Sequence, residues 1–138
     1  MRGVEDPHGR SRYYPNENTI LIDFGADFLD MVHEMVHARE ARNPALVDAE
    51  REFFDHKTET HDKKTLSDLD PLGVHDEDEE AYDVHGRSRY AYLYKDYGDG
   101  GAFEVSSFGV ESMYRDPQGF RKFDREAFDF AAWVFKVM

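Results

Sequence analysis

The segment DFLDMVHEMVHAREAR, residues 27–42, has the pattern of an amphipathic helix. Its apolar residues recur at spacings of three and four and therefore share one helical face: Leu29, Val32 and Val36. The helix should end at Asn43-Pro44, because the residue before a proline avoids the α region. We therefore predict a helix over residues 27–42.

Two histidines lie one turn apart on this helix. His33 and His37 are four residues apart, so both imidazoles can reach one metal ion. Glu34 is rotated by about 100° from His33, from where it can act on a metal-bound water without being a ligand. A metallohydrolase needs two neutral nitrogens, a base and an open position for water. The competing interpretation is a pair of surface histidines.

A third metal ligand must be His, Asp or Glu, because the chain has no cysteine. In residues 103–111, FEVSSFGVE, Glu104 and Glu111 are seven apart and lie near one helical face. Small residues between them would let this segment approach the histidine helix: Ser106, Ser107 and Gly109. Glu104 and Glu111 are both candidates, and an exposed glutamate pair is the alternative.

The remaining histidines and one tyrosine complete the candidates. His85 and Tyr97 precede the glutamate segment, and either could hydrogen-bond the oxyanion of a tetrahedral intermediate. Packing, or a hydrogen bond to a metal ligand, is the alternative for both. The other histidines are expected in loops or on the surface: His8, His56, His61 and His75.

The elements predicted around the helix give an α+β fold with a small antiparallel hairpin or sheet and about four helices. The hairpin is predicted from two β-rich stretches, Arg10–Tyr14 and Thr19–Asp23, with a turn cluster between them. Three further helices are predicted, at residues 45–60, 102–114 and 124–138. Residues 61–85 are polar and predicted to form a solvated loop, and residues 90–94 a short strand. The length suits a single domain, residues 1–138.

Composition excludes several classes of partner. The net charge is −13, from 30 acidic and 17 basic residues, which argues against nucleic acid because phosphate binding relies on Lys and Arg. No stretch approaches the roughly 18 apolar residues of a membrane span, so no membrane partner is expected. Residues 1–6 contain no apolar run, so no secretory signal is expected. We therefore expect a cytoplasmic or virion-associated location.

The histidine motif and the second segment together carry a resemblance. His33-Glu34-x-x-His37 followed by Glu104-Val105-Ser106-Ser107 resembles the gluzincin branch of the zincin metallopeptidases. With Lys95-Asp96-Tyr97 and Phe128-Asp129-Phe130, it more closely resembles zincin-like domains attached to phage head-morphogenesis proteins and bacterial polymorphic toxins. The resemblance covers roughly residues 10–135, and only the two glutamate-bearing motifs in it are specific.

The resemblance implies a minimal zincin-like fold, with an active-site helix, an edge strand above it and a glutamate from a later helix. It implies that His33, His37 and Glu104 bind Zn²⁺ and that Glu34 is the general base. Phe108 stands where the family usually has an acidic residue, so the choice between Glu104 and Glu111 stays open.

The predicted function is zinc-dependent hydrolysis of a peptide or protein substrate, in a chain that could belong to a larger phage or toxin protein. Two other functions compete with it. One is an acidic interaction or inhibitor protein that binds a basic partner surface and holds no metal. The other is a non-catalytic domain in which zinc, closed in by four protein ligands, only holds the fold.

Overall fold

The computed structural model describes residues 2–5, 12–14, 19–22, 28–98 and 103–137. The chain divides into two compact units, the first formed by Met1–Leu46 with Ser106–Met138 and the second by Val47–Val105. Both boundaries fall inside helices, one in α2 (Pro44–Thr58) and one in α4 (Glu104–Arg115). The expectation of a single domain stays a prediction.

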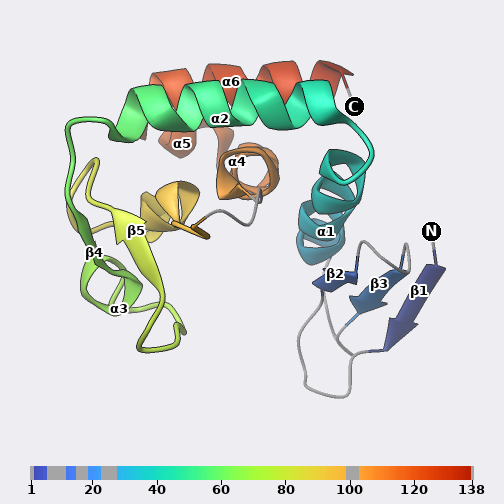
Figure 1. The fold of residues 1–138 in the computed structure, drawn as a ribbon, viewed down its shortest axis with the longest axis horizontal. Coiled ribbons are helices and arrows are strands. Elements are labelled where there is room, and N and C mark those ends of the chain that lie inside the picture. Colours follow the sequence, from blue (N-terminus) through green and yellow to red (C-terminus); the bar gives the residue numbers. More distant parts are fainter. Residues whose placement is uncertain (1, 6–11, 15–18, 23–27, 99–102, 138) are drawn as a thin grey trace. The chain divides into compact units, whose positions relative to one another are not determined.

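The first unit contains a three-stranded sheet in the order β1-β3-β2, formed by Arg2–Glu5, Thr19–Ile22 and Arg12–Tyr14 (Figure 1). Strands β2 and β3 are antiparallel, with Tyr14 opposite Thr19, which confirms the predicted hairpin pairing. Strand β1 runs parallel to β3 and was not predicted. Its four residues, RGVE, carry too little apolar alternation to indicate a strand.

Helix α1 (Phe28–Glu40) contacts β2 and β3 and matches the helix predicted over residues 27–42. The predicted helix at 102–114 is α4, and the C-terminal one is α6 (Arg125–Val137). Between them lies α5 (Pro117–Phe123), which was not predicted. Asp116 caps α5 by accepting a hydrogen bond from the Gly119 N–H at 3.1 Å, and proline at the first position is pre-organised for the helix.

Helix α6 packs against α5 through an edge-to-face pair of rings, Phe120 and Phe128, whose centroids are 5.8 Å apart. Its buried side chains are small or branched: Ala127, Ala131 and Val134. Phe135 is 49% exposed, and its ring packs edge-on against Tyr114. Burying Ala127 and Val134 turns the core face of the helix away from Phe135.

The second unit contains most of α2, which confirms the helix predicted at 45–60, and a two-stranded antiparallel sheet. Strand β4 (Lys63–Thr65) leads directly into the short helix α3 (Leu66–Leu69) and pairs with β5 (Glu80–Tyr82). The prediction of a loop over residues 61–85 is therefore wrong in part. A buried apolar cluster joins this pair to α3 and to the segment after it: Leu66, Leu69, Ala81 and Ala91.

The segment predicted as a strand at residues 90–94 is a 3-10 helix, η1 (Arg89–Tyr94). Ser88 caps it by accepting a hydrogen bond from the Tyr90 N–H at 3.0 Å, which favours the turn over an extended chain. After η1, Lys95 forms an isolated antiparallel bridge with Ala81 on β5, which fixes the backbone that leads to Tyr97.

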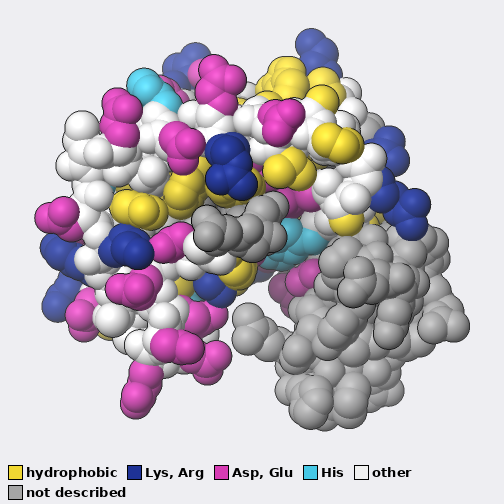
Figure 2. Space-filling model, in the orientation of Figure 1, with side chains coloured by type: hydrophobic (Ala, Val, Ile, Leu, Met, Phe, Trp, Pro, Cys, Tyr) yellow, Lys and Arg dark blue, Asp and Glu magenta, His cyan; other side chains and the backbone are white. Residues whose placement is uncertain are grey.

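The described part of the chain thus contains six α-helices and one 3-10 helix, more than the four expected, with small sheets that agree with the α+β class. No described helix is both long and apolar enough to cross a membrane. Figure 2 shows acidic side chains spread over the described surface, densely where Figure 1 places α3, β4 and β5.

Candidate metal centre

Helix α1 places the two histidines of the motif side by side. The rings of His33 and His37 lie one helical turn apart, with centroids 5.0 Å from each other. Both side chains are partly exposed, while Val36 between them is fully buried and anchors the helix. The helix therefore presents two imidazoles to one place, as the four-residue spacing predicted.

Glu104 brings a carboxylate to the same place. It is the first residue of α4. One ligand atom from each of His33, His37 and Glu104 can be chosen so that all lie within 4.8 Å of one another. Tetrahedral zinc with bonds of 2.0–2.2 Å holds its ligand atoms roughly 3.4 Å apart, so small side-chain rotations would suffice. The group fits a metal ion.

The carboxylate of Glu104 is buried, with only 1% of the residue exposed. Such a group needs polar partners, because burying a charge without them is costly. The Tyr97 hydroxyl donates a hydrogen bond to Glu104 Oε1 at 2.6 Å, the short distance of a charge-assisted bond. Tyr97 as a residue is 37% exposed; partial burial, and then the negative charge of Glu104, raise the pKa of its hydroxyl, which therefore remains a donor. Tyr97 thus holds one oxygen of the candidate ligand.

His37 has a carboxylate partner of its own. Its Nδ1 lies 3.0 Å from Glu40 Oε1, three residues along α1, and Glu40 is buried. Metal-binding histidines commonly donate their second ring N–H to a carboxylate, which fixes the tautomer and leaves the other nitrogen for the metal. The contact with Glu40 would leave Nε2 of His37 for that role. Sequence reasoning missed Glu40, although its i, i+3 spacing from His37 was a usable signal.

The other candidate residues are not members of this ligand group. Glu111 is buried on α4, and its Oε1 lies 3.9 Å from Arg115 Nη2, but it is not a member of the ligand group. His85 is exposed and its ring packs against Tyr94, with centroids 6.3 Å apart. Glu34 is partly exposed on α1, beside His33 in the chain. The roles of Glu34, Tyr97 and His85 in a reaction stay predictions.

The small residues after Glu104 are buried as a set. Ser106, Ser107 and Gly109 are inaccessible to solvent or nearly so, which fits the expectation that this part of α4 is closely packed.

Comparisons with protein-family models, with curated proteins and with solved structures gave no match. The function must therefore be argued from the residues of the site.

Proposed function

We propose that this chain is a zinc-dependent peptidase of the zincin type. His33, His37 and Glu104 are the proposed ligands, and Glu34 is the proposed general base. The observation that carries the proposal is the grouping of the three ligand atoms within 4.8 Å, with two of them one turn apart on α1. The Glu40 carboxylate on His37 supports it, because metal sites use such partners to orient their histidines.

The composition of the ligand group supports zinc and catalysis together. Two imidazoles and a carboxylate form a set that zinc accepts, and catalytic sites typically supply three protein ligands and leave the fourth position to water. A structural site would be closed by a fourth protein ligand. Within the described residues the group has three members, which favours the catalytic alternative.

The proposed roles of the chain's own groups follow from their places. Zinc, when bound, lowers the pKa of its water and polarises a substrate carbonyl. Glu34 would act as the general base, taking a proton from the attacking water and giving it to the leaving amine. Tyr97 holds the Glu104 carboxylate and Glu40 orients His37, so that both ligands are set before the substrate arrives.

The proposed substrate is an extended peptide. Strand β2 ends the order β1-β3-β2 and contacts α1, the helix that carries His33 and His37. An edge strand can hold an extended peptide by adding it to the sheet, with main-chain hydrogen bonds for affinity. A peptide bound this way would run past the histidine helix.

The test is cleavage of an unbiased peptide library by the purified chain. We expect peptide cleavage that is abolished by a chelator and restored by about one equivalent of zinc. Mass spectrometry of the products would show whether the new ends share a residue preference. A zinc-loaded, folded protein that cleaves no member of the library would contradict the peptidase proposal and leave only metal binding.

A further inference from the structure

Lys95 is a buried lysine two residues before Tyr97, the tyrosine that donates to Glu104. Its side chain is 10% exposed, and its Nζ donates to Glu79 Oε1 at 2.7 Å. The backbone of Lys95 is bridged to Ala81 on β5, so the side chain starts from a fixed point. A lysine is seldom buried unless it is paired, and this one is held by a short charge-assisted bond.

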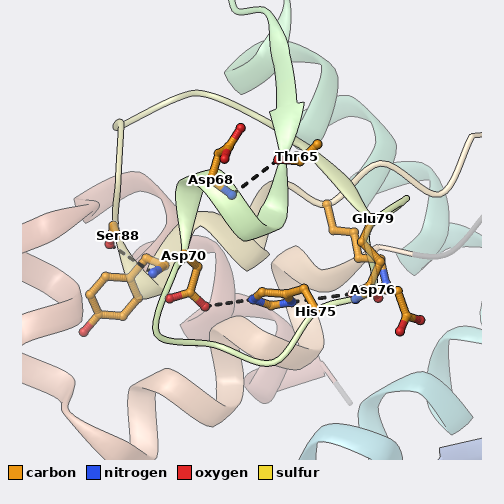
Figure 3. A network of polar contacts seen from close by, with 9 residues as sticks. Thr65, Asp68, Asp70, His75, Asp76, Glu79 and Ser88 are labelled. Atoms are coloured by element: carbon orange, nitrogen blue, oxygen red, sulfur yellow. Dashed lines mark hydrogen bonds and ion pairs between the residues drawn. The ribbon is translucent and has the colours of Figure 1, made fainter.

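Glu79, the anchor of Lys95, is itself held in a polar network (Figure 3). Its Oε2 accepts a hydrogen bond from the Asp76 N–H at 2.9 Å and lies 3.6 Å from His75 Nδ1. His75 Nε2 in turn lies 2.9 Å from Asp70 Oδ2. Burial raises the pKa of Glu79, but the hydrogen bonds from Lys95 and the Asp76 N–H, with the positive charge of Lys95, hold the pKa below its ordinary value. Glu79 therefore stays ionised at neutral pH.

The ammonium of Lys95 also lies over an aromatic face. Its Nζ is 4.4 Å from the centroid of the Tyr97 ring, well inside the range of a cation–π contact. Lys95 has extended backbone angles, and residues two apart on an extended chain point to the same side. The position of Lys95 thereby restricts where the Tyr97 ring can lie.

We propose that Lys95 is a positioning residue for the metal centre: anchored by Glu79, it holds the Tyr97 ring so that the hydroxyl fixes the Glu104 carboxylate. The contacts run without a break from Glu79 to Lys95, Tyr97 and Glu104, and all four residues belong to the second unit. The inference rests on the proposed function in taking Glu104 as a ligand.

The test is a double-mutant cycle on zinc affinity, measured by competition with a chromophoric chelator. Tyr97→Phe should lower the affinity about 10–100-fold, the usual loss when a partner of a ligand is removed. Lys95→Met should lower it about 2–30-fold, the range of a cation–π contact. The double variant should match Tyr97→Phe alone, because Lys95 acts through the tyrosine hydroxyl. Lys95→Arg keeps a cation over the ring and should retain most of the affinity.

Lys63→Met is the matched control. Lys63 donates to Asp96 at 3.1 Å and is far more exposed than Lys95, so the variant removes the same charge close to the same segment. Its ammonium is engaged with the Asp96 carboxylate, and the variant should leave zinc affinity unchanged. Glu79→Gln weakens the contact that anchors Lys95 and should lower zinc affinity as Lys95→Met does. This variant tests the role of Lys95 even if Lys95→Met fails to fold.

A second readout needs no metal. In the metal-free protein, the ring signals of Tyr97 in ¹³C-tyrosine NMR, assigned by their loss in Tyr97→Phe, should shift in Lys95→Met and stay in place in Lys63→Met. Unmoved signals, or additive losses of affinity in the double variant, would overturn the role of Lys95. If the parent binds zinc but no variant alters affinity, the inference fails and the proposed metal site stands; if the parent binds no zinc, the proposed function fails and the inference fails with it.

Discussion

Glu34→Gln is expected to keep its zinc and to lose about 10²- to 10⁴-fold in the rate of peptide cleavage. Glutamine preserves the size and hydrogen bonding of the side chain but cannot accept the proton of the attacking water. Glu34 is not a member of the ligand group, so the metal should remain. The measurement is kcat/KM at saturating zinc, together with the zinc content of the same preparation.

The matched control for this prediction is Glu52→Gln, the same exchange at an exposed position of α2. Its cleavage rate and zinc content should equal those of the parent. Full activity in Glu34→Gln would show that Glu34 is not the base. Loss of zinc from Glu34→Gln would indicate instead that Glu34 binds the metal or stabilises the site that binds it.

Glu104→Ala is expected to reduce zinc affinity by more than about 100-fold, beyond the loss usual for residues that only orient a ligand. Glu104 supplies one of the three grouped ligand atoms, and alanine removes that atom altogether. Glu111→Ala should cost at most about 10–100-fold, because Glu111 lies outside the group and its carboxylate is near Arg115. The measurement is zinc affinity of both variants by competition, under the same conditions.

The pair of variants decides between the two glutamates that the sequence left open. A larger loss in Glu111→Ala would reverse the assignment and keep a two-histidine, one-glutamate site. No loss in either would remove the third ligand from α4. Thermal unfolding of both metal-free variants checks that a loss of affinity does not come from a disrupted helix, since both residues are buried.

Local signals made parts of the fold predictable. The apolar spacing of residues 27–42 and the stop at Asn43-Pro44 are local, and α1 ends at Glu40, two residues before the predicted end. The pairing of β4 with β5 was not predictable in this way. Its strands are three residues long and separated by 14 residues of chain, β4 is entirely polar, and β5 has contacts with η1 and α3 that the sequence does not reveal. Polarity alone therefore predicted a loop.

In the candidate site, too, some features follow from local sequence and others depend on the fold. The spacing of His33 and His37 follows from helix geometry, and the structure places their rings together. Glu104 and Tyr97 are joined by a hydrogen bond that depends on how the chain between them folds, and no periodicity in the sequence predicts it. The same holds for Lys95, whose burial and ring contact are known only from the structure.

The most direct test of the proposed metal site is the metal content of the purified chain, measured by elemental analysis on protein that has never been exposed to a chelator. The account predicts about one zinc per chain, and a large loss of zinc in His37→Ala compared with His56→Ala, the same exchange at an exposed histidine of α2. Zinc that binds only the folded chain should also raise its thermal stability. A folded parent protein that carries no transition metal and takes up none when zinc is supplied would contradict the account.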